Sequence, residues 1–171
     1  FENEALGRFF DGYAFRLGAA EQRQVAVLFT DITQRKRREE NLAFLAQVTE
    51  DLTRLTSADE IAQQLGAKIG AYLQVESCSF SEVDDSRDEL TMLFGWQQAG
   101  TPSPPGTIRM SEYYGDEFQA AGRRRQTIAV GDTQSDPRTQ ARPFADLNIR
   151  SLLSAPFLKQ GRWKYSLMGT S

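Results

Sequence analysis

The feature that most constrains the fold is an uninterrupted stretch, residues 33–56, which contains neither glycine nor proline and separates two strand-rich regions. Apolar side chains recur in this stretch at spacings of three and four, the period that places residues on one face of an α-helix. They are Leu42, Leu45, Val48, Leu52 and Leu55. The stretch therefore predicts a long amphipathic helix that connects two domains. Asp31, with Gln34 three residues later, predicts a capping box at its start.

The region before this helix predicts a β-hairpin. In residues 13–17 the large apolar side chains alternate with smaller or charged ones, and residues 24–30 form a second apolar run. Two strands cannot hold a hydrophobic core by themselves. Because the sequence begins at Phe1 without a methionine, we expect the hairpin to belong to a larger domain or to pack on a partner.

The region after the helix predicts a mixed α+β domain. Ser57 with Glu60 forms a second capping-box pattern, and an apolar residue then recurs every four positions up to Leu73. Two alternating segments, 77–83 and 89–96, predict a hairpin. Further along, Ser111 predicts the N-cap of a helix that ends near Gly122, and a short strand, a short helix and a final hairpin follow. The order predicts an antiparallel sheet with flanking helices.

Composition excludes several classes of chemistry. The chain has 171 residues, no histidine and one cysteine, Cys78. Histidine-based triads, histidine-ligated zinc or haem, and disulfides are therefore excluded. The net charge of −3 argues against a nucleic-acid partner, and no apolar run is long enough for a membrane span. A chain without disulfides favours the cytoplasm.

The first 40 residues resemble the C-terminal end of a PAS domain. The resemblance is carried by the strand "AVLFTDIT" and by "QRKRREE" at the start of the outgoing helix. It implies that residues 1–32 are the last part of a PAS-like domain and that residues 33–56 are a signalling helix. Such helices commonly pair, so we expect a parallel homodimer, formed as a coiled coil through the apolar stripe described above.

Residues 57–171 resemble a GAF domain of the bacterial sensor type. Four segments in order carry the resemblance: "SCSFSEVDD", "TIRMSEYYGDEF", "TIAVGDTQSDPRT" and "NIRSLLSAPFLKQGRW". The resemblance implies an antiparallel sheet with helices, a small-molecule pocket, and a closing helix that these residues do not include. It also implies a dimeric input module upstream of a histidine kinase, as in two-component signal transduction, or of a cyclic-dinucleotide enzyme.

The sequence departs from the GAF families whose ligands are known. The Cys-His pair that attaches bilins in phytochromes is absent from residues 136–141, which argues against a covalent bilin, and haem held by histidine is excluded. The Asn-Lys-Phe-Asp-Glu signature of the cyclic-nucleotide-binding members is also missing, and the cysteines of GAF-type methionine sulfoxide reductases are lacking. The resemblance therefore leaves the ligand of the pocket unassigned.

Candidate ligand-binding residues are the aromatic side chains of the GAF-like region and three charged residues in its turns. They are Phe80, Trp96, Tyr113, Tyr114, Phe118, Asp132, Arg138, Phe144 and Arg150. The aromatic residues either line a cavity or fill the space between sheet and helices, since both arrangements need the same composition. Cys78, on an alternating strand, is expected to be a small buried hydrophobe.

The function expected from these features is that of a regulatory input module, which binds a ligand or receives an upstream state and relays it through paired helices. One alternative is a structural spacer with a filled core, which dimerises and transmits without sensing. A small-molecule enzyme is a weaker alternative, because no pair of carboxylates is spaced to converge. We therefore expect no catalytic site and no metal in this chain.

Overall fold

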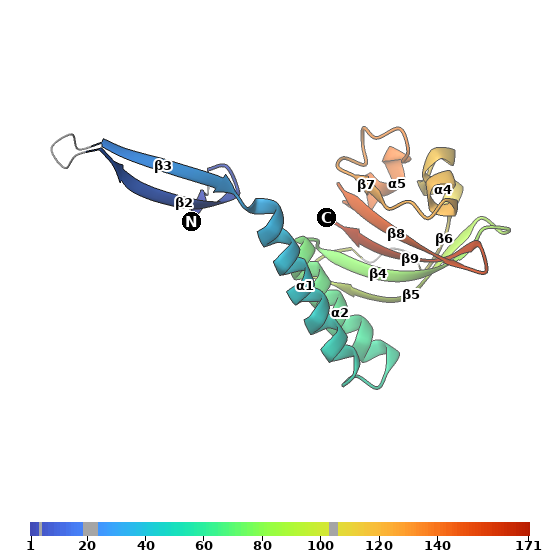
Figure 1. Cartoon of the computed structure of the whole chain (residues 1–171). Helices are drawn as coiled ribbons and strands as arrows, with labels where there is room; N and C mark the ends of the chain where they lie inside the picture. Colours follow the sequence, from blue (N-terminus) through green and yellow to red (C-terminus); the bar gives the residue numbers. More distant parts are fainter. Residues whose placement is uncertain (4, 19–23, 103–105) are drawn as a thin grey trace. The chain divides into compact units, whose positions relative to one another are not determined.

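The computed structural model describes residues 1–3, 5–18, 24–102 and 106–171, and the chain divides into two compact units, Phe1–Arg54 and Leu55–Ser171 (Figure 1). Each unit contains its own β-sheet. No described helix is long and apolar enough to cross a membrane.

The first unit is a small antiparallel sheet followed by a helix. Its strands are β1 (Glu2–Asn3), β2 (Arg8–Leu17) and β3 (Gln24–Asp31), in the order β1-β2-β3. Helix α1 (Thr33–Leu52) starts two residues after β3. The connection between β3 and α1 is held by Thr33, whose hydroxyl accepts a hydrogen bond of 2.9 Å from the Phe9 backbone N–H. The helix therefore begins from a fixed position on β2.

Both ends of α1 differ from the sequence prediction. Asp31 is the last residue of β3 and accepts a hydrogen bond from the Thr33 N–H at 2.9 Å, while the N-cap is Ile32 without a side-chain bond. The predicted capping box of Asp31 and Gln34 is therefore wrong. The helix ends at Leu52, not at residue 56, and its C-cap is Thr53, whose hydroxyl donates a hydrogen bond to the Glu50 carbonyl.

The first unit leaves most of its apolar surface uncovered. No residue of α1 is buried, and Leu42, Leu45 and Leu52 are exposed. The exposed large apolar residues of the hairpin are Tyr13, Phe15, Leu17, Val25, Val27, Leu28 and Phe29. Of the predicted apolar stripe, three leucines are thus exposed, Val48 is half-buried, and Leu55 lies beyond the helix.

The second unit is built on a six-stranded antiparallel sheet with the order β6-β5-β4-β9-β8-β7. The strands are β4 (Ser77–Asp84), β5 (Glu89–Gln97), β6 (Thr107–Arg109), β7 (Ile128–Val130), β8 (Leu152–Lys159) and β9 (Arg162–Thr170). The central pair is β4 with β9, strands that lie far apart in the sequence. The antiparallel sheet predicted for this region is confirmed.

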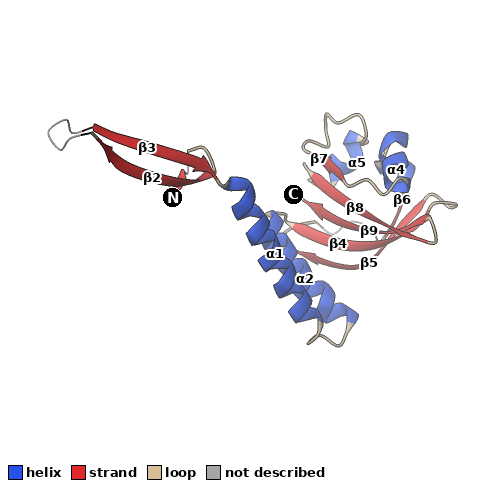
Figure 2. Ribbon diagram, in the orientation of Figure 1, coloured by secondary structure: helices blue, strands red, loops and turns tan. Residues whose placement is uncertain are grey.

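The helices of the second unit cover opposite faces of its sheet (Figure 2). Helix α2 (Ala58–Leu73) begins with the predicted capping box, in which Ser57 Oγ accepts a hydrogen bond from the Glu60 N–H at 3.1 Å. It packs on β4 and β5, where Gly66 and Gly70 leave space for Trp96. We call the face of the sheet under α2 the outer face.

The inner face carries three short helices, α3 (Met110–Tyr113), α4 (Asp116–Arg123) and α5 (Ala141–Asp146). The single helix predicted from Ser111 to Gly122 is wrong, because Tyr114 and Gly115 are extended and break it in two. Tyr114 instead forms a β-bridge with Thr139.

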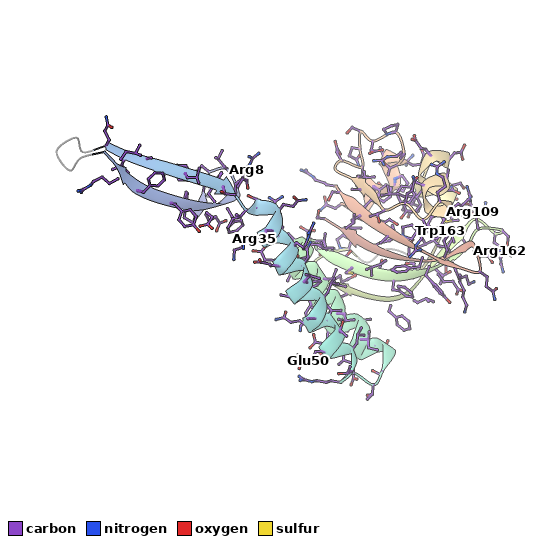
Figure 3. All side chains as sticks on the ribbon, in the orientation of Figure 1. Arg8, Arg35, Glu50, Arg109, Arg162 and Trp163 are labelled. Atoms are coloured by element: carbon purple, nitrogen blue, oxygen red, sulfur yellow. The ribbon has the colours of Figure 1, made fainter. Side chains whose placement is uncertain are left out.

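The hydrophobic core lies between the inner face and α3 to α5. Phe118 and Met110 are its largest fully buried side chains. Trp163 lies on this face beneath α4 (Figure 3), where a Cβ added to Gly122 would be 2.7 Å from its ring. The core thus fills the α4 end of the sheet tightly, whereas a cavity lies at the end near α3 and α5.

Candidate functional site

A cavity of about 410 Å³ lies between the inner face and helices α3 and α5. This volume is within the range of small-molecule sites. Its lining residues are Gln63, Ser77, Cys78, Ser79, Ser81, Leu90, Met92, Gly95, Trp96, Gln97, Ile108, Tyr113, Tyr114, Phe144, Leu147, Ile149, Met168 and Thr170. They come from both layers of the fold, so the cavity depends on the packing of the whole unit.

A row of serines on β4 forms the floor of the cavity. Ser77, Ser79 and Ser81 are alternate residues of one strand and therefore share its inner face. Ser77 Oγ is satisfied by Thr170 Oγ1 at 2.6 Å on the paired strand β9. Ser81 is 1% exposed, and its Oγ has no hydrogen-bond partner among the described residues. A buried hydroxyl without a partner is costly and calls for a specific explanation.

Aromatic side chains form the opposite wall. Tyr113 and Phe144 meet edge to face with ring centroids 5.5 Å apart, and Tyr114 lies 5.7 Å from Phe144. The backbone of this wall is held by hydrogen bonds from the Gln140 N–H to the Tyr113 carbonyl, 2.9 Å, and from the Gly115 N–H to the Arg138 carbonyl, 2.8 Å. The wall is therefore positioned before any ligand arrives.

The cavity is electrically neutral. Among the described residues that line it, none is acidic or basic. Burial raises the pKa of Tyr113, and the nearby carboxylates Glu112 and Asp146 raise it further. Burial also raises the pKa of Tyr114 far above its usual range, so its hydroxyl stays protonated. The Tyr114 hydroxyl donates to Met168 Sδ at 3.8 Å, a weak acceptor.

Four of the nine residues predicted from the sequence border the cavity. They are Trp96, Tyr113, Tyr114 and Phe144. Trp96 borders the cavity, but its ring packs against Gly66 and Gly70 of α2 on the outer face of the sheet. Phe118 lies behind the wall, stacked on Tyr114 with centroids 4.3 Å apart, and belongs to the core.

The other four predicted residues are placed elsewhere. Phe80 is on the outer face, where it stacks on Tyr165 with centroids 5.3 Å apart. Asp132 closes a turn by accepting from the Ser135 hydroxyl, a bond that lowers the pKa of its carboxyl. Arg150 is exposed and does not line the cavity, and its carbonyl accepts a hydrogen bond from the Thr133 N–H.

Arg138 is held by its own loop. Its Nη2 lies 2.6 Å from Asp136 Oδ2 and 2.9 Å from the Ala129 carbonyl. This pairing lowers the pKa of Asp136 and raises that of Arg138. The guanidinium thus ties the segment before α5 to strand β7, and the structure does not bring it to the cavity.

Sequence reasoning missed the residues that make the cavity hollow. Ser79, Ser81 and Gly95 are small residues at inner-face positions of central strands, where large apolar side chains normally fill the core. The repeated serines of β4 were visible in the sequence, and their small size was the available signal. Ile149, Met92 and Met168 had no local signal, because apolar residues in a core and in a cavity look alike.

Cys78 borders the cavity but is not a reactive thiol. It is buried, and desolvation raises its pKa to about 11. A thiol with a raised pKa has little thiolate at neutral pH and reacts slowly. Among the described residues, no group of three or more Cys, Asp or Glu side chains is arranged to hold a metal ion.

Comparisons with known proteins identify the fold. No family model matches the chain, and no curated protein matches its sequence. Among solved structures, the GAF domain of a phosphoenolpyruvate-protein phosphotransferase from Coxiella burnetii is 18% identical with a TM-score of 0.58, and the match covers 76% of each chain. The free methionine-R-sulfoxide reductase of Neisseria meningitidis, in complex with its substrate, is 21% identical with a TM-score of 0.56 over 75% of this chain and 71% of that one.

A third similar structure matches the whole chain. The chromophore-binding domain of a Stigmatella aurantiaca bacteriophytochrome is 11% identical with a TM-score of 0.58, and the match covers 100% of this chain and 63% of that one. At these identities the likeness concerns the fold alone. The chain therefore contains a GAF-like fold, an antiparallel sheet with flanking helices, and this confirms that part of the sequence prediction.

Proposed function

We propose that this chain is a sensory input module whose GAF-like unit binds a small molecule in the cavity described above. The observation that carries the proposal is the cavity of about 410 Å³, whose floor contains the buried hydroxyl of Ser81, which has no hydrogen-bond partner in the described part of the chain. The similar structures support it, since they include a chromophore-binding domain and an enzyme in complex with its substrate.

The proposal is regulatory binding and not catalysis. Acid–base chemistry needs a group that can exchange a proton near neutral pH. The described lining residues offer no carboxylate, lysine or reactive thiol, and the raised pKa of Tyr114 keeps that hydroxyl protonated. A ligand held in such a site is bound and released unchanged.

The signal is proposed to travel through a parallel homodimer of α1. The helix follows the PAS-like hairpin directly, and it exposes Leu42, Leu45 and Leu52, whose burial against a second copy would remove apolar surface from water. A ligand shifts such a helix pair only by binding one arrangement more tightly than the other. We place this relay in the cytoplasm, in a two-component protein with a histidine kinase, and this context rests on the sequence resemblances.

Native mass spectrometry of the chain, purified without a denaturing step, tests both the ligand binding and the dimer. We expect a dimer that carries additional non-covalent mass, and Ser79→Phe, which fills the cavity, should lose that mass while remaining dimeric. Ala129→Phe is the matched control, because Ala129 is an exposed residue of β7 outside the cavity. A dimer without added mass, in both wild type and control, would favour the spacer.

The helix pairing has its own test. Leu45→Glu and Leu52→Glu place a charge on the exposed stripe of α1 and should convert the dimer to a monomer. Gln47→Glu, an exposed change on the same helix outside the leucine stripe, should leave association intact. If both leucine variants remain dimeric, the coiled-coil relay is wrong.

A further inference from the structure

We propose that the ligand of the cavity is an uncharged, mostly apolar organic molecule that presents a hydrogen-bonding group to Ser81. This inference rests on the proposed ligand-binding function and narrows the class of ligand. It follows from three properties of the cavity: the charge of its surroundings, the polar atoms it leaves unsatisfied, and its size.

The surroundings disfavour a charged ligand. A buried ion needs a counter-charge or several hydrogen bonds to replace its hydration. The described lining residues provide no counter-charge, and the neighbouring guanidinium of Arg138 is already occupied by Asp136 and the Ala129 carbonyl. The charged groups that act on the wall at Tyr113 are the carboxylates of Glu112 and Asp146, which repel an anion. Neither residue lines the cavity, so neither offers a cation a direct ion pair there.

The unsatisfied polar atoms are few, and the best defined of them lies on the floor. Ser77 and Thr170 satisfy each other, whereas Ser81 Oγ has no partner among the described residues. The Tyr114 hydroxyl bonds to a thioether, a weak acceptor that a better one can replace. These two hydroxyls, with the Ser79 hydroxyl and the Gln63 and Gln97 amides that also line the cavity, can orient polar groups of a ligand. All of them are neutral, so they supply no counter-charge to a carboxylate, a phosphate or an ammonium group.

The size of the cavity limits the ligand. At ~30 Å³ for each water-sized unit, its volume corresponds to about fourteen such units. A ligand of on the order of ten to fifteen non-hydrogen atoms fits this space. The aromatic wall of Tyr113, Tyr114 and Phe144 favours a flat or aromatic skeleton, since ring contacts add to simple burial.

A matched set of probes tests the inference. The three compounds 1-naphthylmethanol, 1-naphthoate and 1-naphthylmethylammonium share one skeleton and are neutral, anionic and cationic at pH 7.5. Isothermal titration calorimetry with the whole chain should show saturable binding of the alcohol. We expect the two ions to bind at least about tenfold more weakly, which corresponds to about 1.4 kcal/mol.

Variants then assign the binding to the cavity. Ser79→Phe fills the cavity from the sheet and Leu147→Trp fills it from the end of α5, so one remains informative if the other fails to fold. Both should abolish binding of the alcohol, whereas Ala129→Phe should not. Ser81→Ala should weaken binding of the alcohol by about threefold to tenfold, because it removes the hydrogen bond and leaves the shape nearly unchanged.

The possible outcomes distinguish the inference about the ligand class from the proposed function of ligand binding. If 1-naphthoate or 1-naphthylmethylammonium binds as tightly as the alcohol, and the filling variants abolish that binding, the cavity is a ligand site and the uncharged class is wrong. If Ser81→Ala binds the alcohol as wild type does, the assigned contact is wrong. If none of the three probes shows binding that the filling variants remove, the ligand class and the proposed function both fail.

Discussion

Two glycines of α2 are predicted to resist the substitution that normally stabilises a helix. Gly66 and Gly70 lie one turn apart on the face that covers Trp96. Replacing a helical glycine with alanine usually gains about 1 kcal/mol. A Cβ at either position, however, would lie closer than 3.0 Å to Trp96, a distance that forces a neighbour to move. The expected effect therefore reverses its sign.

The two positions should differ in magnitude, because they meet different atoms of the same residue. At Gly66 the nearest atom is the Trp96 Cβ, which cannot move without its backbone. Overpacking of this kind costs about 3 kcal/mol at its upper end, so after the gain in helix propensity Gly66→Ala should lower the free energy of unfolding by roughly 2 kcal/mol. At Gly70 the nearest atoms belong to the indole ring, which can pivot. Gly70→Ala should therefore cost roughly 1 kcal/mol.

Urea unfolding followed by tryptophan fluorescence measures these differences. Both tryptophans of the chain, Trp96 and Trp163, lie in the unit Leu55–Ser171, so the signal reports this unit alone. Ala71→Gly, at an exposed position of the same helix, is the control for helix propensity and should cost about 1 kcal/mol.

Repeating both glycine substitutions in a chain that carries Trp96→Leu tests whether contact with the indole ring causes the loss of stability. Trp96→Leu removes the ring and keeps the Cβ, and Trp163 still reports unfolding. In this background Gly70→Ala should become stabilising by about 1 kcal/mol, whereas Gly66→Ala should remain unfavourable. If both glycine variants stabilise the wild-type chain, or if removal of the ring rescues them equally, the packing argument is refuted.

Three further predictions concern single side chains. The thiol of Cys78, with its pKa raised to about 11, should resist iodoacetamide at pH 8 in the folded chain and react once urea unfolds it. Ser81→Ala should raise the free energy of unfolding of the ligand-free chain by about 1 kcal/mol, because it removes an unsatisfied hydroxyl, whereas Ser166→Ala, which loses the hydrogen bond from Trp163 Nε1 at 3.2 Å, should lower it. Arg123 binds both oxygens of Asp85 and lowers the pKa of that carboxyl. The pair therefore stabilises the fold above the unfolded pKa of about 3.9 and loses this contribution as pH falls through the lower folded value. Asp85→Asn should cost less than about 1 kcal/mol at pH 7, and this cost should shrink as the pH is lowered below the unfolded pKa, as urea unfolding along a pH series would show.

The sequence predicted those parts of the fold that depend on local patterns. The capping box of Ser57 and Glu60 requires residues three positions apart, and the alternating strands require a period of two, so both could be identified without tertiary information. The break between α3 and α4 could not be identified in this way. It depends on Tyr114, which pairs with Thr139 in a bridge that spans distant parts of the chain.

The same division explains the errors at the ends of α1. Asp31 fits the pattern of an N-cap, but its strand pairs with β2 up to that residue and the helix begins later. Thr53 also fits the predicted helix, but the structure places it at the C-cap, where its hydroxyl donates to the Glu50 carbonyl. At Asp31 a tertiary contact, the pairing of β3 with β2, decides where the helix begins, whereas the Thr53 hydroxyl makes a local bond to a carbonyl three residues earlier.

The candidate site could be predicted in part, because aromatic residues are large wherever they lie. Tyr113, Tyr114 and Phe144 were identified by residue type, and helices α3 and α5 then placed them at the cavity. Phe80 has the same type and was placed on the outer face by the alternation of β4. Whether an aromatic side chain reaches the cavity depends on the helix or the strand face that carries it, and composition carries no information about that placement.

The serines of β4 give the reason to regard the hollow as a functional feature. A fold selected for stability alone would place large apolar side chains at these inner-face positions, since close packing stabilises a core. This chain instead places Ser79 and Ser81 there and leaves one hydroxyl unpartnered among the described residues. A ligand that fills the space and bonds to Ser81 would restore both losses and stabilise the folded unit by mass action. In a structural spacer this arrangement would serve no function. If the chain is a spacer, Ser79→Phe should therefore stabilise the GAF-like unit and leave the signalling output intact. In a sensor the same substitution should also stabilise the unit, but the output should no longer respond to the ligand.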